Sequence, residues 1–207
     1  MKINDYFDHI YCVNLDTRTD KWNVCQVEFA KHELTVERWS GAVGSELPRH
    51  PTLMPGEVGC LKSHEMILRD MIDKGYKRVL VLEDDIEFVP NVQSRFSDVI
   101  SLMPNEWDML YLGGSHLNKP TPINHVIAKI SRTYTTSSYG ITAELAKEII
   151  SKFNNTQPHQ VDVLYSHLHI TKKCYSFVPS LAWQRAGHSD IHNTHVDYTS
   201  FMKPKGL

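Results

Sequence analysis

The sequence has no long run of apolar residues. No segment approaches the roughly 20 consecutive apolar residues that a membrane span requires. The first residues, MKINDYFDHIY, have neither the basic nor the apolar region of a signal peptide. We therefore expect a cytoplasmic protein with no membrane span.

Cysteine and net charge are also scarce. Four cysteines are scattered without a CxxC pair, so we predict neither a disulfide nor a zinc finger. The formal net charge is −2, whereas a nucleic-acid binder normally needs a basic surface, and we expect no nucleic-acid partner. The 207 residues contain no internal repeat or low-complexity linker, which favours a single domain over residues 1–207.

Strand and helix signals alternate along the chain. Strands are predicted over residues 9–15, 35–39, 79–82 and 107–112, and helices over 18–31, over 61–74 and after Thr142. Gly75 supplies a left-handed stop for the helix at 61–74. This alternation is typical of an α/β fold with a mainly parallel central sheet flanked by helices.

The predicted strand at residues 79–82 ends in carboxylates. The sequence RVLVLEDDIEF passes from four apolar residues into Glu83, Asp84, Asp85 and Glu87. A strand without a polar face is buried on both sides, and α/β sheets bind ligands beyond the carboxyl ends of their strands. Alternation along a strand predicts that Asp84 points to the side opposite the other three carboxylates.

A divalent cation is the simplest partner for this cluster. Neighbouring carboxylates repel each other and raise each other's pKa values unless a cation neutralises them. Oxygen ligands favour manganese, magnesium or calcium over zinc, and such ions commonly clamp phosphates. We predict Glu83 and Asp85 as metal ligands and Asp84 as a contact to the phosphate-bearing ligand. A solvated turn is the alternative explanation.

Polar and small residues follow two other strands at the same edge of the sheet. Asn14, Asp16 and Arg18 come after the first strand and are candidate nucleotide contacts, although Asp16 also suits a simple helix cap. Gly113 and Gly114 follow a later strand and would let a ligand approach the backbone closely, although an ordinary turn explains them equally well.

The sequence GEVG at residues 56–59 precedes the helix predicted over 61–74. Lys62, Ser63 and His64 then fall in its first turn, where free amides and the helix dipole favour an anion. The spacing is not that of a Walker loop. His64 also suits a packed and hydrogen-bonded position.

Residues 184–195, QRAGHSDIHNTH, are small and polar, which predicts a loop that closes over the acidic strand end. The histidines in this segment are an argument for zinc, but they lack the HExxH spacing of a hydrolase. His192 is kept only as a possible ligand.

Seven segments occur in the order of one known family. They are YCVNLDTRTDKW (11–22), WSGAVG (39–44), PGEVGCLKSHEMIL (55–68), VLEDDIEF (81–88), WDMLYLGG (107–114), YGITAELAKEII (139–150) and PSLAWQRAGHSDI (179–191). Together they cover most of the chain, which resembles glycosyltransferase family 25, a group with bacterial lipopolysaccharide, collagen-modifying and viral members. Lys21 stands where that family has a second arginine, which keeps the charge but not the planar fork.

The resemblance implies a GT-A fold and an inverting transfer of a hexose. The donor would be UDP-galactose or UDP-glucose, and the acceptor a glycan, a lipopolysaccharide, a glycolipid or a glycoprotein. A Mn²⁺ or Mg²⁺ ion would lie at the acidic motif, completed by Asp190, with Gln184 contacting the donor. Residues of about 1–115 would form the nucleotide-sugar half, and those of about 116–207 the acceptor half.

An inverting transfer needs a carboxylate that takes the proton of the acceptor hydroxyl. Asp162 is our candidate for this base, and a simple helix N-cap is its alternative role. A metal-dependent phosphohydrolase or nucleotidyltransferase would use the same carboxylates, but no second carboxylate pair suggests a two-metal centre. A non-catalytic sugar-nucleotide-binding module is the third hypothesis, because 207 residues is short for a glycosyltransferase.

Overall fold

A mixed eight-stranded sheet runs through the middle of the computed structural model, which describes residues 1–153 and 159–206. β10 and β8 run antiparallel to their neighbours, and the other strands share one direction. This confirms the predicted mainly parallel sheet. In spatial order the strands are β2 (Glu37–Ser40), β1 (His9–Asn14), β3 (Arg78–Glu83), β10 (Ser138–Thr142), β5 (Met109–Tyr111), β11 (Cys174–Phe177), β8 (Ile127–Lys129) and β7 (Thr121–Pro122).

Shorter strands form three two-stranded sheets beside this one. They are β4 (Ile86–Phe88) with β12 (Ala182–Gln184), β13 (Gly187–Ser189) with β14 (Thr194–Val196), and β6 (Ser115–His116) with β9 (Thr133–Tyr134). The helices are α1 (Ile3–Tyr6), α2 (Thr19–Lys31), the 3-10 turn η1 (Gly44–Glu46), α3 (Pro55–Asp73), α4 (Val92–Ile100), α5 (Ala143–Lys152), α6 (Val161–Leu168) and α7 (Thr199–Met202).

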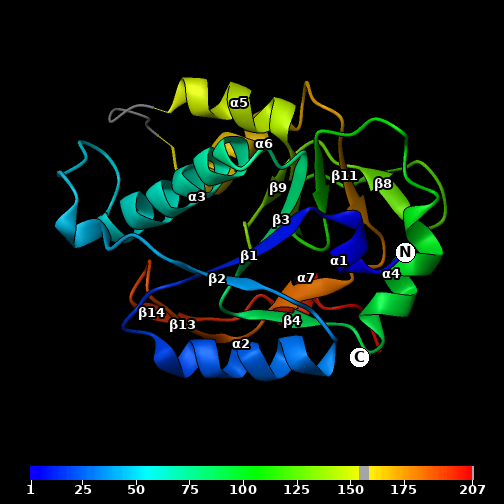
Figure 1. Cartoon of the computed structure of the whole chain (residues 1–207), viewed down its shortest axis with the longest axis horizontal. Coiled ribbons are helices and arrows are strands. Elements are labelled where there is room, and N and C mark those ends of the chain that lie inside the picture. The colour runs from blue at the N-terminus through cyan, green and yellow to red at the C-terminus, as the bar shows by residue number, and fades with distance from the viewer. Residues whose placement is uncertain (154–158, 207) are drawn as a thin grey trace.

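Helices cover both faces of the large sheet. α3, α5 and α6 lie on one side of it, and α2 lies on the opposite side with the short strands β4 and β13 (Figure 1). Each side has its own hydrophobic core. β3 contributes to both cores, with Leu80 and Leu82 in one and Val79 and Val81 in the other, so the strand is buried on both faces as predicted.

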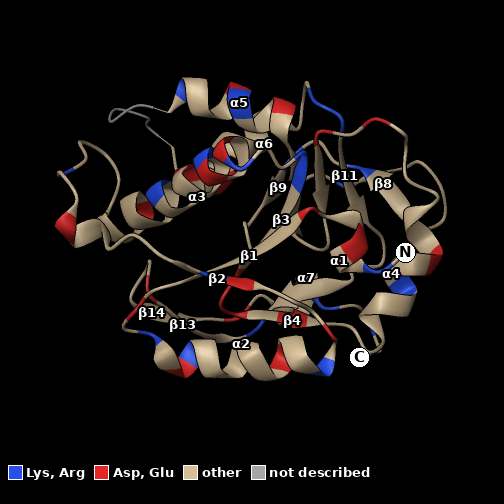
Figure 2. Cartoon of the chain, viewed as in Figure 1, with Lys and Arg blue, Asp and Glu red and all other residues tan. Residues whose placement is uncertain are grey.

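Charges of both signs are spread over the helices. In Figure 2, Lys and Arg alternate with Asp and Glu along α2, α3 and α5. Among the described residues, no helix is both long and apolar enough to cross a membrane. β10, from the predicted acceptor half, lies between β3 and β5 of the predicted donor half, so both halves build one sheet.

Helix α3 begins six residues before its predicted start, at Pro55. Proline fits the first helical position, and the Glu57 carboxylate accepts a hydrogen bond from the Met54 amide at 2.8 Å, which caps the helix. Gly59 lies inside the helix, and glycine is required there because a Cβ would lie 2.5 Å from the Ala42 carbonyl oxygen. The helix ends as predicted, with Gly75 at φ +73°.

The chain turns where the sequence suggested a continuous strand. β3 ends at Glu83, and a turn at Asp84 and Asp85 leads into β4, which pairs with β12 instead of the main sheet. Side chains therefore do not alternate through the acidic motif. The segment at 184–195 is likewise not an irregular loop. It contains the hairpin of β13 and β14, which ends at Val196.

Gly113 lies where the end of β5 meets the start of β12. The Leu112 carbonyl oxygen accepts hydrogen bonds from the amides of Leu181 and Ala182, at 2.7 and 3.3 Å. A Cβ at position 113 would lie 1.9 Å from the Ala182 carbonyl oxygen. The glycine is thus required by close backbone packing.

We predict that Gly113→Ala lowers the free energy of unfolding by about 1–3 kcal/mol, the usual cost of overpacking. Gly187→Ala is the matched control, because a Cβ there meets nothing within 4 Å. Urea denaturation followed by circular dichroism measures both. Equal stability of the two variants would contradict the packing role.

Candidate active site at the end of β3

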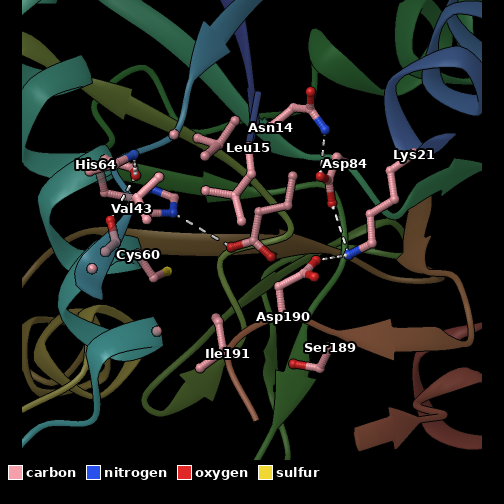
Figure 3. A pocket seen from close by; sticks show the side chains of 18 of the residues that line it. Asn14, Leu15, Lys21, Val43, Cys60, His64, Asp84, Ser189, Asp190 and Ile191 are labelled. Atoms are coloured by element: carbon pink, nitrogen blue, oxygen red, sulfur yellow. Dashed lines mark hydrogen bonds and ion pairs between the residues drawn. The ribbon is translucent and has the colours of Figure 1, made fainter. Parts of the chain in front are cut away.

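A cavity of about 320 Å³ opens beyond the carboxyl ends of β1 and β3. The loop at residues 41–45, the first half of α3 and the tip of the β13–β14 hairpin enclose it (Figure 3). The hairpin tip packs directly on α3, since a Cβ at Gly56 would lie 2.7 Å from the Cα of Ile191. We call this space the first cavity.

A second cavity of about 230 Å³ adjoins the first. The start of α6, the segment before β10 and the β13–β14 hairpin line it. The residues that line both cavities are Cys60, Glu83, Gln184, Ser189 and Ile191. The end of β3 is therefore a shared wall between the two spaces.

Glu83 is the carboxylate in this shared wall. It accepts a hydrogen bond from the Thr136 hydroxyl at 2.5 Å, and its Oε1 lies 3.5 Å from Nε2 of the buried His64. Burial raises the pKa of the Glu83 carboxyl, but the His64 imidazole and Thr136 outweigh burial, so the pKa lies below its ordinary value. Glu83 is therefore ionised at neutral pH.

Asp84 and Asp85 occupy the turn after β3 and differ in their partners. Asp84 accepts a hydrogen bond from Asn14 at 2.8 Å and lies 3.4 Å from the Lys21 ammonium. Asp85 accepts one from Gln184 at 2.8 Å, while its buried Oδ1 has no hydrogen-bond partner among the described residues. Burial raises the pKa values of both carboxyls, and the charges of its two acidic neighbours help to bring that of Asp85 to about 7.

The unpartnered oxygen of Asp85 makes the acidic motif suitable for a hard divalent cation. A buried carboxylate oxygen without a donor is unfavourable, and a cation beside it would satisfy both its charge and its lone pairs. All three carboxylates line the first cavity. The donor set of oxygens matches Mn²⁺ or Mg²⁺.

Asp190 also lines the first cavity, where it shares the Lys21 ammonium with Asp84. Its side chain is paired with Arg18 and with Lys21, whose ammonium lies 2.8 Å from Oδ2 (Figure 3). Burial raises the pKa of Asp190, but the two cations outweigh burial and lower it. The β13–β14 hairpin is thereby tied to α2 and to the loop before it.

The other residues predicted near the first strand lie at different depths. Asn14 is buried, lines the first cavity and also accepts a hydrogen bond from Arg38 at 2.8 Å. Asp16 is exposed, pairs with Arg38 at 2.8 Å and lines neither cavity. Its partner Ser40 donates a hydrogen bond at 2.8 Å, so Asp16 joins the ends of β1 and β2.

The helix-terminus site predicted at Lys62, Ser63 and His64 is wrong, because α3 starts at Pro55 and these residues lie more than one turn inside it. Lys62 pairs with Glu65 at 3.0 Å and lines neither cavity. Ser63 and His64 do line the first cavity. The Ser63 hydroxyl accepts a hydrogen bond from the Ala42 amide at 2.8 Å and so holds the loop at 41–45.

Asp162 lies in the second cavity, inside the first turn of α6. The N-cap of that helix is Gln160, so Asp162 is not the cap. Its carboxylate accepts hydrogen bonds from the amides of Val163 at 2.8 Å and Thr135 at 3.3 Å. Burial raises the pKa of Asp162 in spite of these bonds.

Sequence reasoning noted Lys21 only as a departure from the family pattern, and it missed two other residues of the site. Lys21 lines the first cavity, Thr136 lines the second, and Cys60 lines both. The spacing of Cys60 and His64, four residues apart, was the available signal once the helix is known to start at Pro55. Gly113 and Gly114 line neither cavity.

Comparison with known proteins points to one family. Residues 7–165 match the family model described as "Glycosyltransferase family 25 (LPS biosynthesis protein)". A "Glycosyltransferase 25 family member" of Anopheles gambiae is 30% identical over 167 residues, which cover 69% of this chain and 28% of that protein. An "Inactive glycosyltransferase 25 family member 3" of Homo sapiens is 32% identical over 107 residues, 48% of this chain and 18% of that protein.

A viral relative and a solved structure extend the comparison. The "Procollagen lysyl hydroxylase and glycosyltransferase" of Acanthamoeba polyphaga mimivirus is 29% identical over 171 residues, 68% of this chain and 19% of that protein. This chain thus spans less than a third of the length of these relatives. The structure of "a glycosyltransferase involved in the glycosylation of the major capsid of PBCV-1" aligns over 87% of this chain and 93% of its own at 12% identity, with a TM-score of 0.49.

We predict that Asp85 makes the ion-free protein less stable as the pH rises from about 4 to about 7. The pKa of Asp85 is raised to about 7 in the folded state, so the stability present below the ordinary aspartate pKa is lost as the pH rises through 7. Asp85→Asn should remove this loss, which amounts to at most about 4 kcal/mol.

Thermal unfolding in a metal chelator between pH 4 and pH 8 measures the difference between wild type and Asp85→Asn. Asp98→Asn, at an exposed position of α4, is the control and should follow the wild type. A wild-type curve parallel to that of Asp85→Asn would contradict the raised pKa.

Proposed function

Because this chain belongs to glycosyltransferase family 25, we propose that it transfers a hexose, galactose or glucose, from a UDP-sugar to a hydroxyl group of its acceptor with inversion. The observation that carries the proposal is the first cavity, in which three carboxylates at the end of β3 include one with a buried, unpartnered oxygen. The relatives are much longer than this chain, so the acceptor could contact segments that it does not contain.

The first cavity is our proposed donor site. Asn14 and Asp84 line it, and Lys21 offers an ammonium group for a diphosphate. In this structure the carboxylate of Asp190 pairs with both Lys21 and Arg18, in the position that we propose for the diphosphate. A diphosphate would compete with Asp190 for both cations, and its arrival would free the tip of the hairpin.

Glu83 and Asp85 are the proposed ligands of a Mn²⁺ or Mg²⁺ ion, with Asp84 beside them. Asp190 joins this set only when its ion pairs with Arg18 and Lys21 break. When bound, such an ion neutralises the diphosphate and stabilises the charge on the departing UDP. Gln184 keeps the Asp85 carboxylate oriented through the hydrogen bond to its Oδ2.

The second cavity is our proposed acceptor site. The two cavities adjoin at Glu83 and Cys60, and an acceptor hydroxyl at this border would attack the anomeric carbon from the face opposite UDP. Asp162 would take the hydroxyl proton, and a pKa raised by burial makes a carboxylate a stronger base. Two other carboxylates, Asp108 and Glu144, line neither cavity, so they are poorer candidates for the base.

We predict that Asp162→Asn binds the donor as the wild type does but transfers about 10²- to 10⁴-fold more slowly, because it lacks the proton acceptor. Asp85→Asn should instead lose the manganese-dependent part of donor binding. Glu144→Gln, at an exposed position of α5, is the control for both. Calorimetry measures donor binding, and UDP release in the presence of an acceptor measures transfer.

Near wild-type transfer by Asp162→Asn would show that the base lies elsewhere. Glu83 would then be tested next, because it borders both cavities. Unchanged transfer and binding by Asp85→Asn would reject the proposed metal site.

A non-catalytic sugar-nucleotide-binding module is the second candidate function. The observation that favours it is that the Homo sapiens and Bos taurus relatives are named as inactive or probably inactive members. Binding of a UDP-sugar without UDP release, over a broad set of hydroxyl acceptors, would support this candidate over a transferase.

A further inference from the structure

A cysteine, a histidine and a glutamate meet at the wall between the two cavities. Cys60 and His64 lie four residues apart on α3, on the face directed to the end of β3, where Glu83 lies (Figure 3). The Cys60 Sγ, one ring nitrogen of His64 and a carboxylate oxygen of Glu83 all lie within 4.8 Å of one another. Among the described residues, this is the one group of three such donors found this close together.

The His64 imidazole is oriented and incompletely satisfied. The side chain is fully buried, and Nδ1 lies 2.8 Å from the Tyr139 hydroxyl, which in turn lies 3.3 Å from the Tyr165 hydroxyl. Nε2 is buried without a hydrogen-bond partner and faces Oε1 of Glu83 at 3.5 Å. In the tautomer in which Nδ1 donates to the Tyr139 hydroxyl, which is the one that metal binding requires, Nε2 presents its lone pair to the space between Cys60 and Glu83.

The chemistry of these donors differs from that of the acidic motif. Sulfur, imidazole nitrogen and one carboxylate oxygen are a set that zinc accepts, whereas Mn²⁺ and Mg²⁺ prefer oxygen alone. Two ligands four residues apart on a helix present their donor atoms to the same ion, as in other helical zinc motifs. The Thr136 hydroxyl donates a hydrogen bond to the Glu83 carboxylate and so helps to fix it.

We propose that Cys60, His64 and Glu83 form a zinc site, which shares Glu83 with the proposed hard-cation site and differs from it in its sulfur and nitrogen donors. All three line the first cavity, and Cys60 and Glu83 also line the second, so the fourth coordination position faces the cavities and is open to water or to a ligand oxygen. Binding converts the Cys60 thiol to a thiolate and releases its proton to water. The site does not depend on the proposed transfer activity.

The test measures metal binding directly. Protein stripped with a chelator is mixed with Zn²⁺, passed through a desalting column and analysed for bound metal, and the affinity is measured against a chromophoric chelator. Co²⁺ replaces Zn²⁺ in a parallel titration, because a cobalt–thiolate bond gives an absorption band that reports on cysteine ligation. We expect one retained zinc per chain and a thiolate band with cobalt.

Matched variants separate this site from others. Cys60→Ser should lose the cobalt–thiolate band and weaken zinc binding at least about 100-fold, and Tyr139→Phe, which removes the partner of Nδ1, should weaken it about 10- to 100-fold. Cys174→Ser, at a buried thiol of β11, and Asp85→Asn should retain the band. His195→Ala tests the exposed histidines of the hairpin and should also retain zinc.

Absence of retained zinc in the folded wild type would overturn the proposal, and would leave His64 and Glu83 as an ion pair alone. Zinc binding that survives Cys60→Ser unchanged, or that is lost in His195→Ala, would overturn it as well. Circular dichroism checks the folding of each variant, and Glu83→Gln replaces Cys60→Ser if that variant does not fold.

Discussion

Neutralisation of adjacent carboxylates at the end of a buried strand is the constraint around which this structure is organised. β3 lies between two hydrophobic cores, and its last residue and the turn after it carry Glu83, Asp84 and Asp85. Each carboxylate is satisfied by a different part of the chain: His64 of α3 and Thr136 contact the first, Asn14 and Lys21 the second, and Gln184 of β12 the third. Among the described residues, the buried Oδ1 of Asp85 has no hydrogen-bond partner, and this makes the motif suited to a cation.

The end of β3 borders both the first and the second cavity. Glu83 and Cys60 border both cavities, while Asp84 and Lys21 face only the first and Asp162 only the second. In the proposed function, the donor and the acceptor occupy these adjoining spaces and meet at their border. In that function, the hairpin tip at Asp190 and Ile191 closes the donor site. It also moves when the donor binds, because the cations that hold Asp190 are those that a diphosphate would attract.

The sequence predicted those features that depend on neighbouring residues. The apolar run before Glu83, the helix at 18–31 and the left-handed stop at Gly75 follow from local pattern and backbone preference, and the structure confirms each. Family-like segments also placed the acidic motif and residues 184–191 at one site. Asn14, Asp84 and Gln184 do meet there.

Features that depend on distant backbone contacts were not predictable in this way. GEVG was placed before the helix, yet its residues lie inside α3, and Gly59 is a glycine because the Ala42 carbonyl oxygen lies where its Cβ would be. Gly113 suggested room for a ligand, but the Ala182 carbonyl oxygen fills that room. Cys60 gave no signal while α3 was expected to begin after it. The ion pairs of Asp190 with Arg18 and Lys21 join segments far apart in the sequence, so local pattern could not indicate them.

The central claim is that the first cavity binds a uridine diphosphate sugar together with a hard divalent cation. Isothermal titration calorimetry with a panel of nucleotide sugars, with and without Mn²⁺, tests base, sugar and metal in one experiment. The account predicts that a UDP-hexose binds most tightly and that Mn²⁺ strengthens its binding. Tighter binding of a GDP- or CMP-sugar, or UDP-hexose binding that Mn²⁺ leaves unchanged, would contradict it.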